Sequence, residues 1–93
     1  MSFTRESAVE RAKRDLVKRL NVDADGVTEF GVADRDFPDM SLGAPAKDEM
    51  SAQMIASGWE IKLVARGKTY EYRADKHQLR LHNFNGANHV VEQ

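Results

Sequence analysis

Two neighbouring runs of alternating apolar and charged residues constrain the fold of this chain most. Residues 59–65 read W-E-I-K-L-V-A and residues 69–74 read T-Y-E-Y-R-A. Alternation with a period of two is typical of β-strands that bury one face and expose the other. Because Arg66-Gly67 lies between the two runs, the pattern predicts a β-hairpin. Its buried face would carry five large side chains, namely Trp59, Ile61, Leu63, Tyr70 and Tyr72.

Residues 5–20 predict an amphipathic helix that could cover this face. Thr4 suits the N-cap position, and Asn21 suits a left-handed stop at the other end. At 100° per residue the apolar side chains fall within one stripe, which comprises Val9, Ala12, Leu16, Val17 and Leu20. Neither this stripe nor the apolar face of the sheet can be buried alone, so we expect the helix to lie across the sheet.

Two shorter segments complete the predicted sheet. Residues 27–32, with a bulge suggested by Gly31, and residues 78–82 both have strand patterns. Residues 34–57 contain both prolines and no clear period, and a short helix over residues 46–55 stays open. We therefore predict an α+β fold with one N-terminal helix on a three- to four-stranded antiparallel meander. A long irregular loop would join the first two strands.

The expected domain organisation is simple. Residues 1–84 are predicted to form a single α+β domain, and residues 85–93 a flexible C-terminal tail. The 93-residue chain has no cysteine, which excludes disulfides and cysteine-based zinc sites. It has no apolar run that could span a bilayer, and it starts without the apolar stretch of a signal peptide. These features predict a cytoplasmic protein with no membrane association.

Charge is distributed unevenly along the chain. The formal charge of −1 divides into +3 over residues 1–20, −6 over residues 21–50 and +2 over residues 51–93. Nucleic-acid binders usually have a basic excess on one face, and here the basic segment also contains acidic residues. We therefore expect no nucleic-acid partner, and the acidic middle segment becomes the more unusual feature.

Motifs for metal binding and catalysis are incomplete. Residues 21–29, N-V-D-A-D-G-V-T-E, resemble the start of an EF-hand loop, but the twelfth position is Val32 rather than a glutamate. His77, His82 and His89 do not have the spacing of helical metal ligands. Nucleophile-elbow, phosphate-loop and dinucleotide-binding motifs do not occur. We therefore expect no metal, no cofactor and no catalytic residues.

Four segments carry a family resemblance. They are F-P-D-M-S-L-G-A-P at 37–45, S-A-Q at 51–53, G-W-E-I-K-L at 58–63 and G-K-T-Y-E-Y-R-A-D at 67–75. Together they resemble a small, largely uncharacterised family of bacterial and plant domains with the pattern W-P-D-x-S-L-G-C-P, Y-x-Q, P-G-Y-x-I-x-L and Y-x-Y-H. The order of elements is also similar to that of PepSY-type domains, as a fold-level analogy.

This chain departs from the family pattern at several motif positions. Phe37 replaces the tryptophan, Ala44 the cysteine, Ser51 the tyrosine and Arg73 the histidine. The terminal cysteine of many members falls near His82. Any chemistry or disulfide that depends on the family cysteines is therefore excluded here. The resemblance implies a fold and no established activity.

The function that we expect is non-catalytic binding or regulation, with the acidic 34–57 segment presented to a protein partner. Phe37-Pro38 would form a rigid corner, and Leu42 a second anchor. A protein is expected because no cluster of convergent polar groups marks a small-molecule pocket. By the PepSY analogy, modulation or inhibition of a peptidase is one concrete form. The candidate contact residues are Asp34, Asp36, Phe37, Pro38, Asp39, Ser41, Leu42 and Gln53.

Three alternatives remain open at this point. The segment could merely cover one end of the sheet. The chain could be a small hydrolase that uses loop carboxylates with His77 or His82, or a binder of nucleic acid or an anionic surface through Arg11, Arg14 and Lys18. A monomer or a weak dimer paired through an edge strand fits the sequence equally well.

Overall fold

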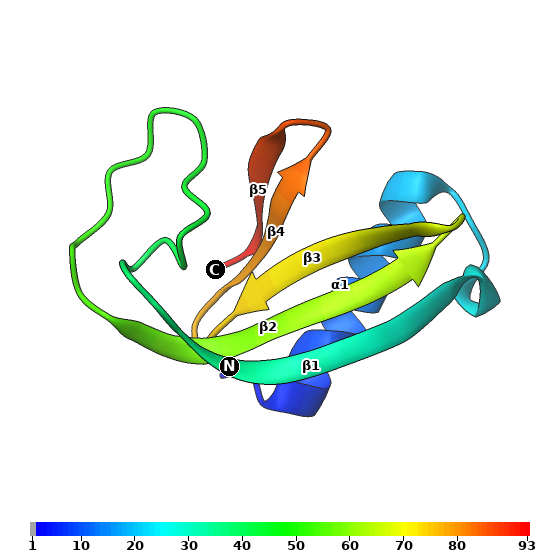
Figure 1. Cartoon of the computed structure of the whole chain (residues 1–93), viewed down its shortest axis with the longest axis horizontal. Helices are drawn as coiled ribbons and strands as arrows, with labels where there is room; N and C mark the ends of the chain where they lie inside the picture. Colours follow the sequence, from blue (N-terminus) through cyan, green and yellow to red (C-terminus); the bar gives the residue numbers. More distant parts are fainter. Residues whose placement is uncertain (1) are drawn as a thin grey trace.

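One helix lies across one face of a five-stranded antiparallel sheet (Figure 1). The computed structural model describes residues 2–93. The strands follow one another in the sheet in chain order, from β1 to β5. In chain order the elements are α1 (Arg5–Leu20), the 3₁₀ turn η1 (Ala24–Gly26), β1 (Val27–Phe37), β2 (Ala56–Ala65), β3 (Lys68–Ala74), β4 (Leu79–Phe84) and β5 (Ala87–Glu92). The α+β fold is as predicted, with one strand more than expected.

Local sequence determines both ends of α1. The Thr4 hydroxyl accepts a hydrogen bond from the Ser7 amide at 3.1 Å, and the Ser7 hydroxyl accepts one from the Thr4 amide at 2.8 Å. This reciprocal pair satisfies two amides that have no partner within the helix. At the other end Asn21 has a φ of 53°, and the Val22 amide donates to the Val17 carbonyl at 3.2 Å. The predicted boundaries of the helix are thus confirmed.

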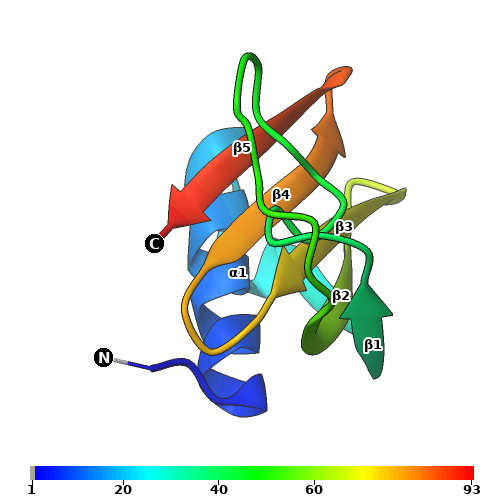
Figure 2. The same cartoon turned by 90° about the vertical axis from the view of Figure 1, so that its left-hand side faces the viewer.

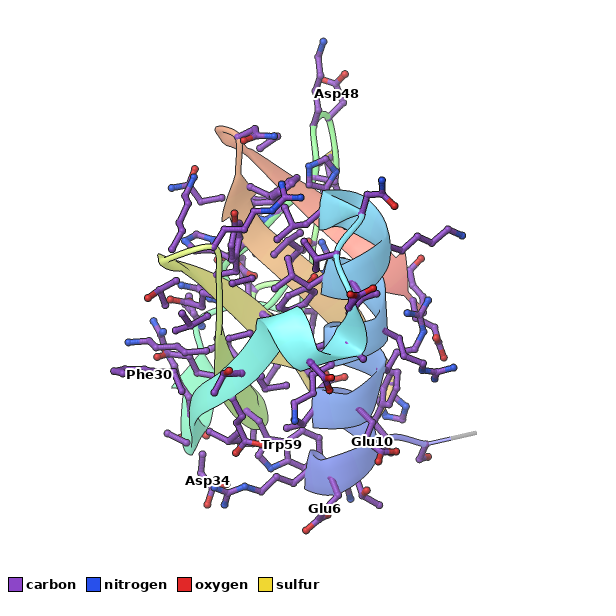
Figure 3. All side chains as sticks on the ribbon, turned by 90° about the vertical axis from the view of Figure 1, so that its right-hand side faces the viewer. Glu6, Glu10, Phe30, Asp34, Asp48 and Trp59 are labelled. Carbon is purple, nitrogen blue, oxygen red and sulfur yellow. The ribbon has the colours of Figure 1, made fainter. Side chains whose placement is uncertain are left out.

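The main core lies between α1 and the sheet. Leu16, Ile61, Leu63 and Tyr72 are fully buried there, and Trp59 packs against them while half-buried. Figure 3 shows Trp59 at the end of the sheet near the start of α1. The hydrogen bond from the Tyr72 hydroxyl to an Asp15 carboxylate oxygen, 2.7 Å long, crosses this core. The predicted contact between the helix stripe and the aromatic hairpin face is confirmed.

The last segment of the chain differs from the expected tail. Residues 87–92 form β5, which pairs with β4 through Arg80 and Val90. Asn85 and Gly86 have φ values of 52° and 85°, as a tight hairpin turn requires. Asn-Gly is a strong signal for such a turn, and it explains why the sheet continues where the sequence analysis ended it.

The segment between β1 and β2 also differs from the expectation in two respects. Strand β1 continues to Phe37, so the irregular loop covers residues 38–55. Residues 46–55 contain no helix, only a turn in which the Glu49 amide donates to the Ala46 carbonyl at 3.0 Å. Within residues 2–93 no helix is long and apolar enough to cross a membrane.

Candidate binding site: the β1–β2 loop

The loop of residues 38–55 lies beside β4 and β5, at one end of the sheet (Figures 1 and 2). It contacts the sheet on the face opposite α1. Successive side chains of a strand point to opposite faces of the sheet. Tyr72, Ala74 and Leu81 belong to the core under α1, so their neighbours Arg73 and Arg80 point to the other face. These two arginines bind the loop. We call residues 38–49 the docked half and residues 50–55 the outer half.

A small apolar cluster anchors the start of the docked half. Phe37 and Leu42 are 1% and 0% exposed, and they pack with Ala56 in a core separate from that under α1. The Phe37 ring also lies near two guanidinium groups, with centroid distances of 5.3 Å to Arg35 and 5.6 Å to Arg73. Such cation–π contacts add to the burial of the ring. The predicted roles of Phe37 and Leu42 as anchors match this geometry.

Asp39 organises the turn that follows Pro38. Its Oδ1 atom accepts hydrogen bonds from the amides of Ser41 at 3.0 Å and Gly43 at 3.1 Å, and from the Ser41 hydroxyl. The bond from the Ser41 hydroxyl, followed by that from the Gly43 amide, lowers the pKa of Asp39. The carboxylate is therefore used within the loop, and Ser41 is completely buried.

Arg73 binds the loop through its backbone. Its Nη1 donates to the carbonyls of Leu42 and Gly43, each at 3.0 Å. Gly43 has a φ of +64°, and a Cβ atom there would lie 2.8 Å from this Nη1. The left-handed backbone conformation favours glycine at this position, and a larger residue would displace the Arg73 guanidinium from its two carbonyl partners. This contact accounts for the glycine of the S-L-G motif.

Arg80 is the most deeply buried charge in the site, at 2% exposure. Its guanidinium forms an ion pair with Glu49, with 2.7 Å between Nη2 and Oε2, and donates to the Ala44 carbonyl at 3.2 Å. Its Nε donates to Gln78 Oε1 at 2.7 Å. Hydrogen bonding from Arg80 lowers the pKa of Glu49 to about 2. The Glu49 carboxylate therefore stays ionised well below neutral pH.

Two amide side chains complete the attachment. Gln78 Nε2 donates to the Met40 carbonyl at 2.6 Å, and Asn88 Nδ2 donates to the Pro45 carbonyl at 2.9 Å. Five backbone carbonyls within a six-residue stretch of the loop thus accept hydrogen bonds from the sheet. The donors are side chains of β3, β4 and β5 and of Gln78, directly before β4. Those carbonyls belong to Met40, Leu42, Gly43, Ala44 and Pro45.

The outer half has the opposite character. Met50, Met54 and Ile55 are 97%, 63% and 73% exposed. Among residues 2–93 one further large apolar side chain is exposed. This is Phe30, at 70%, which lies at the bulge of β1 and points away from α1 (Figure 3). Three of these four exposed side chains therefore fall within a stretch of six residues. Figure 3 also shows Asp48 at the tip of the loop.

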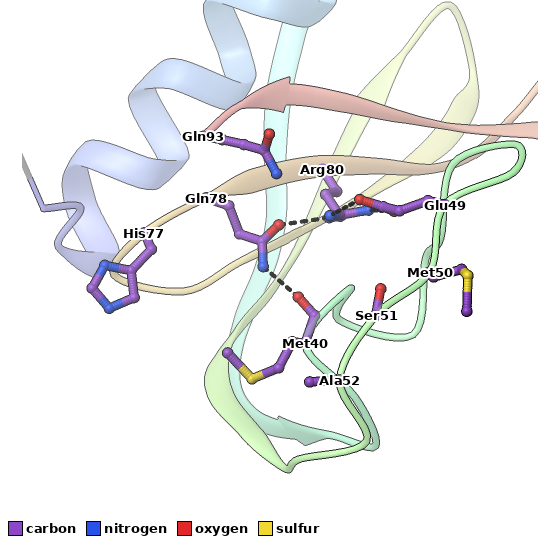
Figure 4. Close-up of a pocket in the computed structure, with 9 residues that line it drawn as sticks. All are labelled: Met40, Glu49, Met50, Ser51, Ala52, His77, Gln78, Arg80 and Gln93. Atoms are coloured by element: carbon purple, nitrogen blue, oxygen red, sulfur yellow. Dashed lines mark hydrogen bonds and ion pairs between the residues drawn. The ribbon is translucent and has the colours of Figure 1, made fainter.

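A hollow of about 430 Å³ lies between the two halves of the loop and β4 (Figure 4). Its lining includes Met40, Glu49, Met50, His77, Gln78 and Arg80. The polar groups of Gln78, Glu49 and Arg80 already bind one another or the loop backbone. The hollow therefore lies beside an internal network of hydrogen bonds. These polar groups on its wall already have partners within the protein.

The predicted contact residues divide into three groups. Phe37, Leu42 and Ser41 are buried, and Asp39 binds its own turn. Asp34 and Asp36 belong to β1, where Asp36 accepts a hydrogen bond from the Ser57 hydroxyl at 2.8 Å. Pro38 and Gln53 lie in the loop and are exposed. Of the predicted set, Gln53 alone belongs to the outer half.

Sequence reasoning missed three residues outside the loop that bind it, Gln78, Arg80 and Asn88. It also missed the role of Arg73 and that of Glu49, the loop residue that pairs with Arg80. One signal was present: in the β3–β4 register Arg73 pairs directly with Arg80. Like charges directly opposite each other destabilise a sheet unless something neutralises them. Glu71, 2.7 Å from Arg73 Nε, and Glu49 supply this compensation.

The residues named for a hydrolase and for a binder of anionic surfaces do not come together in one site. His77 is in the exposed turn before β4, whereas His82 is on β4, with an Nδ1 atom that is buried without a hydrogen-bond partner. Arg11 forms an ion pair with Glu92 at 2.8 Å, while Arg14 and Lys18 are exposed on α1. Across residues 2–93 no group of three or more His, Asp and Glu side chains could hold a metal ion.

Comparison with known protein families assigns the chain to one of them. Residues 9–82 match a family described as a domain of unknown function, DUF8738, and the chain belongs to that family. The match includes most of α1, the whole loop and the strands through most of β4. The comparisons with curated proteins and with solved structures gave no match.

Proposed function

We propose that this chain is a non-catalytic protein-binding domain that contacts its partner through the outer half of the β1–β2 loop. The observation that carries the proposal is the contrast within the loop. The docked half is held by buried arginines, whereas Met50, Met54 and Ile55 are exposed. Exposed apolar residues that gather in one place commonly mark interaction sites.

The attachment of the docked half supports a binding role. Ordering a free loop on association costs free energy, and a loop that is already fixed at one end avoids part of that cost. Methionine adds to this, because its flexible thioether adapts to varied apolar surfaces. In this proposal Phe37, Leu42 and Asp39 position the loop, and the outer half, including Gln53, makes the contact.

The acidic side chains of the original hypothesis have a secondary role. Asp48 is exposed at the tip of the loop, so a partner with a basic group facing this tip would fit it. Modulation or inhibition of a peptidase is the specific form that we propose, by analogy with the element order of PepSY-type domains. A hydrolytic role has less support, because no described hydrogen bond joins the side chain of His77 or His82 to a carboxylate.

Affinity co-purification from native cells tests the proposal. The variants are the triple Met50→Ser/Met54→Ser/Ile55→Ser and the matched control Phe30→Ser, which removes the exposed apolar residue outside the loop. We expect a partner that the wild type and Phe30→Ser retain equally and that the triple variant loses by about tenfold or more. Equal recovery by the triple variant would contradict the proposal.

A further inference from the structure

The sulfur atoms of this chain are concentrated in the loop. The chain has no cysteine and four methionines, and three of these, Met40, Met50 and Met54, lie within residues 38–55. Methionine is therefore the sole side chain of this protein that can be oxidised at sulfur. Oxidation converts the thioether into a polar sulfoxide, which methionine sulfoxide reductases can reverse.

The three loop methionines differ in their access to solvent. Met50 is 97% exposed and Met54 is 63% exposed, and both lie in the outer half. Met40 lies in the docked half and is partly buried against Phe37, Leu42 and Ala56. Its backbone is also fixed, because its amide donates to the Ala52 carbonyl at 3.0 Å and its carbonyl accepts from Gln78. Only the outer pair presents its sulfur atoms freely to a dissolved oxidant.

We infer that Met50 and Met54 form a reversible oxidation site for hydroperoxides, and that oxidation there switches off the binding surface of the loop. A sulfur lone pair attacks one oxygen atom of hydrogen peroxide, and the O–O bond breaks. The thioether gains one oxygen atom and is oxidised by two electrons, while the peroxide is reduced and leaves as water after proton transfer. The inference rests on the proposed function for its effect on binding.

The position of the two methionines separates this modification from damage to the fold. Neither residue belongs to the core under α1 or to the cluster around Phe37. Their side chains also form no part of the hydrogen bonds that attach the docked half. Sulfoxides at positions 50 and 54 therefore change the polarity of the outer half and leave the attachment intact.

The first experiment measures where oxidation occurs, without any partner. The folded protein is treated with hydrogen peroxide and digested with trypsin; cleavage after Arg35 and Lys47 places Met40 on a different peptide from the other two. Mass spectrometry, with fragment ions to resolve Met50 from Met54, should show both oxidised about fivefold faster than Met40. In concentrated guanidinium chloride the three rates should converge. Equal rates in the folded protein would overturn the inference.

The second experiment tests the switch. Peroxide treatment should reduce co-purification of the partner about tenfold for the wild type, and a methionine sulfoxide reductase should restore it. The variant Met50→Leu/Met54→Leu remains apolar at both positions and cannot be oxidised there, so its binding should survive the treatment. Retained binding by wild type with confirmed sulfoxides at both positions would overturn the switch.

Together with the triple serine variant described above, these experiments separate failure of this inference from failure of the proposed function. If the triple serine variant binds as well as the wild type, the proposed function is wrong and the binding effect falls with it, whatever the order of oxidation. If the serine variant loses binding while the oxidised wild type retains it, the loop is the contact surface and the proposed switch is wrong. Thermal unfolding of the oxidised protein, which should keep its Tm, shows that the fold has been preserved.

Discussion

The two faces of the sheet are covered in different ways. On one face α1 covers fully buried apolar side chains such as Leu16, Ile61 and Leu63, which are held by burial of apolar surface. On the other face the docked half of the loop is held by arginine and amide side chains bound to backbone carbonyls. The first type of contact depends on the shape and volume of side chains. The second depends on donors that reach main-chain atoms, together with one ion pair from a loop side chain, between Glu49 and Arg80.

The largest expected effect comes from the helix face. Leu16→Ala removes a completely buried side chain, and the cavity left behind should lower the free energy of unfolding by about 3 kcal/mol. Urea unfolding followed by Trp59 fluorescence measures this change. Lys18→Ala on the exposed side of α1 is the control and should be almost neutral. A loss below about 1 kcal/mol for Leu16→Ala would contradict the importance assigned to this face.

The loop face should show a smaller effect that depends on pH. Glu49→Gln removes the carboxylate that compensates the buried Arg80, and we expect a loss of about 2 kcal/mol at neutral pH, because Glu49 is itself a quarter exposed. The pKa of Glu49 falls from its usual 4.5 to about 2 on folding. A carboxyl group with a lowered pKa stabilises the fold above pH 4.5, and this contribution is lost as the pH falls towards 2.

Urea unfolding over that pH range compares the wild type with this variant. The difference between them should shrink on acidification, and Glu10→Gln on the exposed side of α1 should follow the wild type throughout. Coinciding curves for wild type and Glu49→Gln would show that the ion pair contributes nothing to attachment of the loop. The comparison between the two faces would then rest on the carbonyl contacts alone.

The smallest effect tests a partly buried polar contact between α1 and the sheet. Tyr72→Phe removes the hydroxyl that donates to Asp15, and Asp15 keeps its ion pair with Arg19 at 2.6 Å. We therefore expect a loss of about 1 kcal/mol. Burial, followed by the hydrogen bond to Asp15, raises the pKa of Tyr72. Alkaline titration by ultraviolet absorbance should accordingly find a tyrosine that ionises later than a free phenol, and that is absent from Tyr72→Phe.

The two faces also differ in how far the sequence could predict them. The alternation around Ile61 and Tyr72 and the helical stripe through Leu16 follow the periods of their own elements, so the helix face was predictable. The contacts of Arg73 and Arg80 have no such period, because their acceptors are carbonyls, which every residue has. The identity of the residue matters mainly at Gly43, Asp39 and Glu49 and at the anchors Phe37 and Leu42. The two anchors were predicted from the motif, whereas the side chains that donate to the loop carbonyls were not.

The missed strand has another physical cause. Asn85-Gly86 is a turn signal, but the residues after it alternate weakly, since Val90 and Val91 are adjacent. Pairing with β4 and the contact of Asn88 with Pro45 hold β5 in place. Tertiary contacts therefore override a weak local pattern at this end of the chain.

The spacing of the loop contacts along the chain has a kinetic consequence. The bonds from Arg73, Arg80 and Asn88 join residues separated by 31, 36 and 43 positions. Their donors come into place only after the successive hairpins from β2 to β5 have formed, so we expect the loop to attach after the folding transition state. Substitutions that weaken this attachment should then accelerate unfolding and leave the refolding rate almost unchanged. The lifetime of the native state, more than the speed of its formation, would be set by the arginines of β3 and β4.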